Sequence, residues 1–202
     1  MWWWWVLPLS VLDALLDVLA TRQPRVVLDS GRPEAAVALL LAADPDRLLL
    51  IRRADRASDP WSGQLALPGG RRDPVDADLM ATAIRETEEE VGVVVDPATH
   101  HATLDDLAPV HAVLPPILVR PFVFRVEHQA SLRLSHEVTS ATWVTLAALT
   151  APGVFRESEI LVRDLPMVVS GYHLQEGLLW GMTERILTPV IRSWEELISG
   201  NR

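Results

Sequence analysis

Residues Leu67–Val93, LPGGRRDPVDADLMATAIRETEEEVGV, decide the fold. Within them, Pro68-Gly69-Gly70 forces a turn, because proline and glycine favour backbone angles that end a strand. Ala77–Val91 then carries apolar residues at helical spacing, with Asp76 as the expected N-cap and Gly92 just past the end. The stretch therefore predicts a tight loop that leads into a helix.

Three carboxylates occupy one side of this predicted helix. Glu86, Glu89 and Glu90 fall within about a 100° sector, where their charges repel one another. Taken alone, such an acidic face is more often solvated than metal-binding. The Gly69-Gly70 loop beside it changes this balance, because glycine lets backbone groups approach a ligand closely and Mg²⁺ prefers oxygen ligands. The segment therefore indicates a metal site suited to a charged diphosphate.

The same segment resembles the sequence box of the Nudix hydrolase family. That box has a Gly, five residues, a Glu, seven residues and then Arg-Glu-apolar-x-Glu-Glu-x-Gly-apolar. The matching positions in this chain are Gly70, Arg85, Glu86, Glu89, Glu90, Gly92 and Val93. The chain departs from the box because Asp76 replaces the first Glu, eight residues separate it from Arg85, and Thr87 takes the apolar position. The Asp form with the extra residue looks like the coenzyme A diphosphatase subgroup.

Other segments resemble the same subgroup. They are Leu48–Arg53, Arg120–Val123, Glu137-Val138 with Trp143–Leu146, and Gly177–Thr183. The subgroup's additional signature upstream of the box is only partly present. Ile51 stands where the subgroup has Thr, and Trp61 stands where it has His. These departures concern the identity of the substrate.

The resemblance implies roles for individual residues around a Mg²⁺ or Mn²⁺ cofactor. Glu86 and Glu90 would be the principal metal ligands, with Glu89 assisting through the metal or a water, and the Gly70 region would add a backbone carbonyl. Arg85 would orient Glu86. Many Nudix enzymes carry a further carboxylate in a late loop, and the candidate here is Glu137; an exposed residue that opens a strand is the equal alternative.

Basic and aromatic residues near the box are candidates for binding the substrate. Arg52, Arg53 and Arg71 could meet its phosphate groups, although a solvated surface role is the simpler alternative for any single arginine. Trp61 could stack on a base, with plain packing as the alternative.

The implied reaction is hydrolysis of a diphosphate linkage in a nucleoside diphosphate derivative. Coenzyme A or an acyl-CoA is the substrate that the subgroup resemblance favours, with 3′,5′-ADP and 4′-phosphopantetheine as products. ADP-ribose, dinucleotides and (d)NTPs are the alternatives. A non-catalytic Nudix-fold ligand-binding module is a third reading, which usually shows loss of box glutamates; Glu86, Glu89 and Glu90 are all present here.

Composition limits the classes of function. The chain has 202 residues, no cysteine and a formal net charge of -9. It therefore has no disulfide framework, thiolate metal ligand or cysteine nucleophile. The excess of 27 acidic over 18 basic residues argues against a nucleic-acid partner. We expect a cytoplasmic enzyme whose partner is a small-molecule nucleotide.

Apolar runs outside the box predict strands, and their order predicts the fold class. The expected strands are Ala35–Ala42, Leu48–Ile51, Ile117–Val126 and Ala141–Leu146, and a last helix is expected at about residues 182–198. Mixed strands, a helix, more strands and a second helix predict an α+β fold. The family resemblance implies, more specifically, an α/β/α sandwich with a mixed sheet between helices.

We expect an N-terminal part at residues 1–24 and a hydrolase domain at residues 25–202, with the box at 70–93. The N-terminal part contains four consecutive tryptophans, Trp2–Trp5, followed by an amphipathic helix. Asp13 interrupts the apolar run well short of the ~20 residues that a transmembrane helix needs, so we expect no stable membrane insertion. A short helix packed on the domain is the expected structure, and a homodimer contact or membrane adhesion is the alternative role of the tryptophans.

Overall fold

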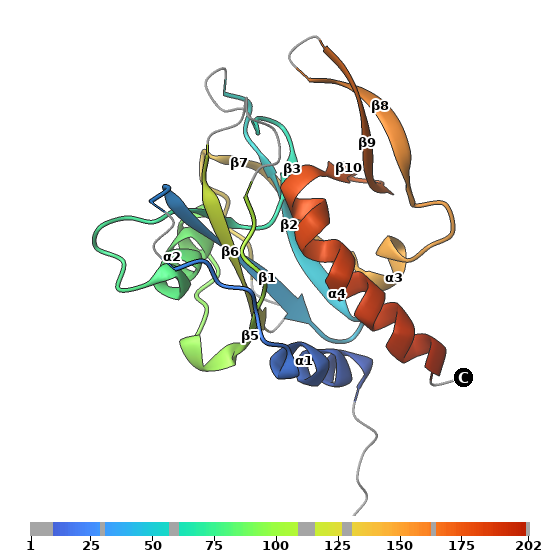
Figure 1. Cartoon of the computed structure of the whole chain (residues 1–202), viewed down its shortest axis with the longest axis horizontal. Helices are drawn as coiled ribbons and strands as arrows, with labels where there is room; N and C mark the ends of the chain where they lie inside the picture. The colour runs from blue at the N-terminus through green and yellow to red at the C-terminus, as the bar shows by residue number, and fades with distance from the viewer. Residues whose placement is uncertain are drawn as a thin grey trace, which may run out of the picture.

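The structure, a computed structural model, describes residues 10–28, 31–56, 61–108, 116–126, 131–162 and 165–200, so the tryptophan run lies outside the described residues. Within them, a main sheet of seven strands lies between helices, and a sheet of three strands stands beside it (Figure 1). The main sheet contains β1 (Glu34–Ala42), β2 (Arg47–Arg53), β3 (Leu65–Ala66), β4 (Gly69–Arg71), β5 (His100–Thr103), β6 (Leu118–Arg125) and β7 (Val138–Thr145). The smaller sheet contains β8 (Phe155–Val162), β9 (Leu165–Leu174) and β10 (Gly177–Trp180).

The main sheet is mixed, as the sequence predicts. Its strand order is β3-β2-β1-β6-β5, with β4 paired to β1 and β7 paired to β2. β1 runs parallel to β6 and antiparallel to β2 and β4. The predicted apolar strands on either side of the turn at residues 43–46 are confirmed as β1 and β2.

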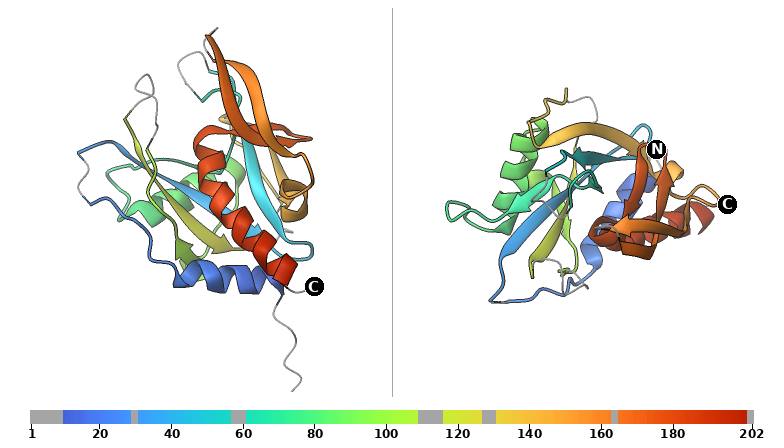
Figure 2. Two further views of the ribbon diagram at one scale, coloured as in Figure 1. Left: turned by 45° about the vertical axis from the view of Figure 1, so that its right-hand side comes forward. Right: turned by 90° about the horizontal axis from the view of Figure 1, so that it is seen from above.

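Helices cover both faces of the main sheet (Figure 2). The helix α2 (Leu79–Val91) lies on one face, and α1 (Val11–Thr21) and α4 (Gly181–Gly200) lie on the other. Side chains alternate along β1, so that Leu39 and Leu41 pack in the cluster of α1 and α4, whereas Leu40 packs with α2. The α/β/α sandwich is therefore confirmed, and burial on both faces explains the continuous apolar runs of the central strands.

The helix α1 is capped by Ser10 and has the apolar face that an amphipathic helix predicts. The Ser10 Oγ accepts a hydrogen bond from the Asp13 backbone N–H at 3.1 Å, which caps the first turn. The buried residues of α1 are Leu12, Leu15, Leu16 and Leu19. This face packs into the same apolar cluster as α4, while the division of the chain at residue 24 stays a prediction. None of the described helices combines the length and apolar character that a membrane span requires.

The start of α2 differs from the prediction. The helix begins at Leu79 rather than Ala77, and Asp78 is its N-cap, because the Asp78 side chain accepts a hydrogen bond from the Ala81 N–H. The carboxylate of Asp76 instead binds other side chains of the site. The end of the helix is as expected, because Gly92 adopts the left-handed conformation at φ 70°.

The smaller sheet leads the chain back to the main body. The strands β8 and β9 form a ribbon that projects away from the sandwich (Figure 1). β10 returns along β9 and ends at Trp180, directly before α4 begins. The predicted C-terminal helix is confirmed and runs slightly beyond the expected residues 182–198 at both ends. Two short helices, η1 (Pro97–Thr99) and α3 (Leu146–Leu149), complete the described elements.

Candidate active site

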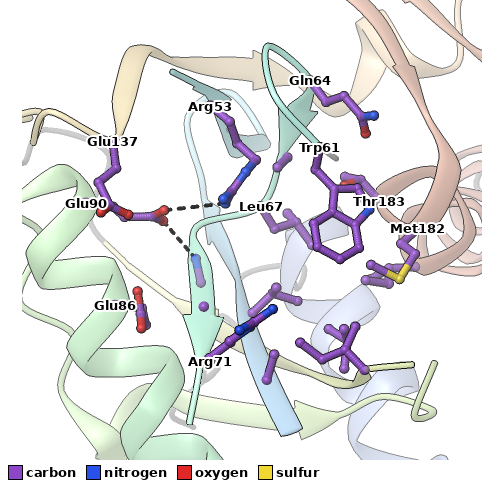
Figure 3. A pocket seen from close by; sticks show the side chains of 18 of the residues that line it. Arg53, Trp61, Gln64, Leu67, Arg71, Glu86, Glu90, Glu137, Met182 and Thr183 are labelled. Atoms are coloured by element: carbon purple, nitrogen blue, oxygen red, sulfur yellow. Dashed lines mark hydrogen bonds and ion pairs between the residues drawn. The ribbon is translucent and has the colours of Figure 1, made fainter. Parts of the chain in front are cut away.

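A cavity of about 400 Å³ lies where α2, the strands β3 and β4, and the start of α4 meet. Carboxylates line one side of it, apolar side chains line the other, and arginines lie between them (Figure 3). The residues that line it are Ala35, Val37, Arg53, Arg56, Trp61, Gln64, Ala66, Leu67, Gly69, Gly70, Arg71, Glu86, Glu90, Ile117, Val119, Glu137, Met182, Thr183 and Ile186. The cavity thus brings together the predicted helix, strand β4 in place of the predicted turn, and an apolar wall from segments that are distant in the sequence.

Glu90 is the deeply buried carboxylate of the site, with 3% of its surface exposed. Its Oε2 accepts a hydrogen bond from the Gly69 backbone N–H at 2.9 Å, and its Oε1 lies 3.9 Å from the Arg53 Nη1 (Figure 3). Burial raises the pKa of Glu90 to about 7, against the opposing effects of the Gly69 N–H and the Arg53 charge. Burial therefore disfavours the charged form of this carboxylate, and further positive charge nearby would favour that form.

Glu86 lies one turn earlier on α2, directly against the Gly70 backbone. A methyl group added at Gly70 would lie 2.6 Å from the Glu86 Oε1, so the carboxylate occupies space that any other residue would fill. Burial raises the pKa of Glu86, and the neighbouring Arg85 opposes that shift. The loop and the helix are thus packed together at the two carboxylates.

Arg85 joins the loop to the helix. Its guanidinium donates two hydrogen bonds to the Asp76 carboxylate, at 2.9 and 3.0 Å, and lies 3.0 Å from the Glu86 Oε1. It also donates to the Arg71 carbonyl at 3.1 Å. The hydrogen bonds from Arg85 hold the pKa of the buried Asp76 carboxyl well below its usual range. Arg85 therefore contacts Glu86, as predicted, but its bidentate partner is Asp76.

Glu89 points away from the cavity. Its side chain is 59% exposed and accepts a hydrogen bond from Arg85 at 2.9 Å. It does not line the cavity, unlike Glu86 and Glu90. The structure thus separates the three predicted glutamates into two that face the cavity and one that lies on the outer side of Arg85.

The structure places Glu137, the predicted late carboxylate, beside Glu86 and Glu90 in the cavity wall. It lies immediately before β7 and lines the cavity from the side opposite the apolar wall (Figure 3). Its negative charge adds to the burial that raises the pKa values of Glu86 and Glu90. Its own carboxylate lies 3.1 Å from the Arg56 Nη1.

The predicted substrate-binding residues do not all reach the cavity. Arg53, Arg71 and Trp61 line it, whereas Arg52 does not. Because side chains alternate along β2, Arg52 points to the opposite side and donates to the carbonyls of Gly63 and Glu176. Arg52 thus ties β2 to the β9–β10 turn.

The donor set at this site fits a hard divalent cation. Within the described part of the chain, no three His, Cys, Asp or Glu side chains form a ready-made metal cage. Mg²⁺ does not require one, because it is commonly held by one or two carboxylates, waters and substrate phosphates. Glu90 supplies a buried carboxylate and Glu86 a partly buried one, which occupies the space that a side chain at position 70 would fill. These residues therefore match the predicted Mg²⁺ or Mn²⁺ in chemistry.

The sequence did not single out several residues of the site. Asp76 was assigned to capping, although its spacing from Arg85 was the available signal. The apolar wall comes from Ile117, Val119 and Met182, which are far apart in the sequence and meet only in the fold.

Comparisons with known proteins agree with this geometry. The model of the family described as NUDIX domain matches residues 32–164, more than half of the chain. An uncharacterised protein of Schizosaccharomyces pombe is 35% identical over 162 residues, which span 68% of this chain and about half (49%) of that protein. The uncharacterised Nudix hydrolase NudL of Photorhabdus laumondii is 32% identical over 165 residues, 81% of this chain and 86% of that protein.

A solved structure supports the fold. The crystal structure of a MutT/nudix family protein from Enterococcus faecalis matches with a TM-score of 0.58 and 18% sequence identity, over 94% of this chain and 70% of that one.

Proposed function

The chain belongs to the Nudix family, and we propose that it is a diphosphohydrolase that uses Mg²⁺ or Mn²⁺ to cleave coenzyme A or an acyl-CoA. The general reaction is hydrolysis of a nucleoside diphosphate derivative, and coenzyme A is the specific substrate that we propose. The observation that carries the proposal is the pair of carboxylates, the partly buried Glu86 and the buried Glu90, which face a cavity also lined by arginines.

The reaction adds one water across a phosphoric anhydride. The water oxygen bonds to one phosphorus, and the bond from that phosphorus to the bridging oxygen breaks. With coenzyme A the products are 3′,5′-ADP and 4′-phosphopantetheine. A divalent metal bound by Glu86 and Glu90 would supply charge neutralisation of the phosphate oxygens and activation of the water. The chain itself supplies no covalent nucleophile in this scheme.

Each side chain then has a defined task in the proposal. Arg85 holds Glu86 in place through their 3.0 Å contact, and Asp76 in turn holds Arg85. Arg53 and Arg71 lie beside the carboxylates, where they would orient the diphosphate oxygens. Glu137 would accept the proton of the attacking water as general base. Glu89 would assist by contacting the metal through a water.

The preference for coenzyme A rests on sequence resemblance and on the shape of the cavity. The Gly177–Thr183 segment resembles the coenzyme A diphosphatase subgroup, and its last two residues, Met182 and Thr183, line the cavity. Met182 belongs to the apolar wall with Ile117 and Val119, and Trp61 packs against the same cluster. Met182 and Trp61 lie across the cavity from the carboxylates (Figure 3). An amphipathic substrate, with a diphosphate at one end and a less polar group at the other, suits this division. Trp61 would pack against that less polar group or stack on the base.

A substrate panel tests the proposal. Coenzyme A, ADP-ribose, a dinucleoside polyphosphate and a dNTP would be compared at equal concentration with Mg²⁺, and the products identified by mass spectrometry. We expect the highest kcat/KM with coenzyme A, together with 3′,5′-ADP and 4′-phosphopantetheine. Much faster cleavage of ADP-ribose or another nucleotide would replace coenzyme A as the substrate. No cleavage of any diphosphate would overturn the enzymatic function.

A further inference from the structure

Arg56 and Glu137 form an ion pair on the wall of the cavity. The Arg56 Nη1 lies 3.1 Å from the Glu137 Oε1, and both residues line the cavity. They come from separate segments, since Arg56 follows β2 and Glu137 directly precedes β7. Both side chains are 41% exposed, so each can reach solvent or a ligand.

The backbone around this pair is held in place. The Ala54 N–H donates to the Glu137 carbonyl at 2.8 Å, which ties the two segments together. The Arg56 N–H donates to the Ser62 Oγ at 2.6 Å, and the Glu137 N–H donates to the Ser135 Oγ at 3.2 Å. Because the backbone is anchored on both sides, the side chains are the parts that can exchange partners.

The Arg56–Glu137 ion pair is weak compared with the contact that an arginine makes with a phosphate. Ion pairs between exposed side chains contribute only about 0.2–1 kcal/mol, because water screens the charges. A guanidinium and a phosphate form parallel charge-assisted hydrogen bonds, which are roughly twice as strong as neutral ones. An entering phosphate group can therefore compete with Glu137 for Arg56.

The charges of the cavity favour that exchange. Three arginines and three glutamates line it: Arg53, Arg56, Arg71, Glu86, Glu90 and Glu137. Two of these arginines already have a carboxylate nearby when no ligand is bound, because Arg53 lies 3.9 Å from Glu90 and Arg56 lies 3.1 Å from Glu137. Glu137 also repels Glu86 and Glu90, so a cation beside those two carboxylates would draw Glu137 toward it and away from Arg56.

We propose that Arg56 binds a phosphate group of the diphosphate substrate, and that Glu137 occupies Arg56 until the substrate arrives. This inference rests on the proposed function and adds a substrate-binding residue together with its resting partner. It also gives Glu137 two positions, one on Arg56 and one turned toward the other carboxylates when the substrate is bound.

The test measures ADP binding without metal, by calorimetry in EDTA, in wild type, Arg56→Ala, Glu137→Gln and the double variant. If Glu137 competes with the anion, Glu137→Gln binds ADP about two- to fivefold more tightly than wild type, which is the range set by an exposed pair. Arg56→Ala binds about tenfold more weakly, because a charge-assisted contact is lost. The double variant binds like Arg56→Ala, because no arginine remains to be released.

The exposed pair Arg72–Glu34 is the matched control. It has the same 3.1 Å separation, the Arg72 side chain is also 41% exposed, and neither residue lines the cavity. Arg72→Ala and Glu34→Gln are expected to leave ADP binding unchanged. Thermal unfolding of every variant checks that the fold is intact.

Two results would overturn the inference. Glu137→Gln could tighten ADP binding equally with and without Arg56, which would show a general effect of charge. Arg56→Ala could bind ADP as well as wild type, which would show that Arg56 does not touch the anion. The outcome is independent of turnover: a wild-type protein that passes this binding cycle but cleaves no diphosphate overturns the proposed function alone.

Discussion

Single atoms decide how the two carboxylates of the site are held. The backbone of Gly70 is not in the left-handed region, so an alanine there would have an ordinary conformation, yet its methyl group would meet the Glu86 carboxylate. Glu90 is buried against the backbone N–H of Gly69, the preceding residue of β4. At this scale Gly70 leaves room for the Glu86 carboxylate, whereas Gly69 leaves room for Ala36 and Val37 of β1.

Gly70→Ala is expected to lower the free energy of unfolding by about 1–3 kcal/mol, the usual cost of overpacking. The same substitution in a Glu86→Ala background should have little effect, because the group it would meet is gone. Urea unfolding of the four proteins measures this difference. An equal loss of stability in both backgrounds would show that the backbone, and not Glu86, rejects the methyl group.

The raised pKa of the buried Glu90 predicts how the stability of the protein changes with pH. Its pKa rises from 4.5 to about 7 in the folded protein, so between these values the folded state binds more protons than the unfolded state. In EDTA, stability should therefore fall as pH rises from 5 to 8. Glu90→Gln carries no charge to desolvate and should reduce this decline. Parallel pH profiles of stability for wild type and variant would contradict the burial of an ionisable Glu90.

At the scale of elements, α1 and α4 cover one face of the sheet and α2 covers the other. The buried leucines of α1 pack into the cluster that contains Ile186 and Ile191 of α4. Because the cavity lies beside the start of α4, α1 supports the site without lining it.

Leu16→Ala is expected to cost about 2–5 kcal/mol of stability, because it leaves a cavity beneath α1. At a temperature where the variant stays folded, its KM should match that of wild type. Val18→Ala, at a position on the same helix that is 38% exposed, is the control and should change stability by about 0.5 kcal/mol or less. Equal effects of the two substitutions would contradict the packing of α1.

At the scale of the whole molecule, the features that depend on local sequence patterns were predicted better than those that depend on long-range contacts. The box predicted α2 and the glutamates, because both depend on residues close in sequence. The turn predicted at Pro68-Gly69-Gly70 was wrong in part, since Gly69 and Gly70 lie in strand β4, which pairs with β1. The helix start was wrong by two residues, since Asp76 is used by Arg85 and Asp78 takes the cap. Helical spacing placed Glu89 with Glu86 and Glu90, but Glu89 does not line the cavity and instead accepts a hydrogen bond from Arg85.

Contacts between distant segments could not be predicted. The β2 alternation indicates that Arg52 and Arg53 point to opposite sides, but only the fold shows which of them faces the cavity. Arg56 pairs with Glu137, which lies 81 positions away in the sequence. The sequence around each residue does not predict this contact. The side of the cavity that carries Glu86 and Glu90 is thus local in sequence, whereas the rest of the cavity depends on contacts between distant segments.

The central claim is that Glu86 and Glu90 hold the metal that diphosphate hydrolysis needs. The most direct measurement is Mn²⁺ binding by electron paramagnetic resonance, made alongside coenzyme A turnover, for wild type, Glu86→Gln and Glu90→Gln. Glu88→Gln, which changes an exposed residue of the same helix, is the matched control. We predict that both site variants stay folded, bind Mn²⁺ far more weakly and lose at least about 100-fold in kcat, close to 3 kcal/mol of transition-state stabilisation, while Glu88→Gln matches wild type. Near-full Mn²⁺ binding and turnover in both site variants would contradict the account.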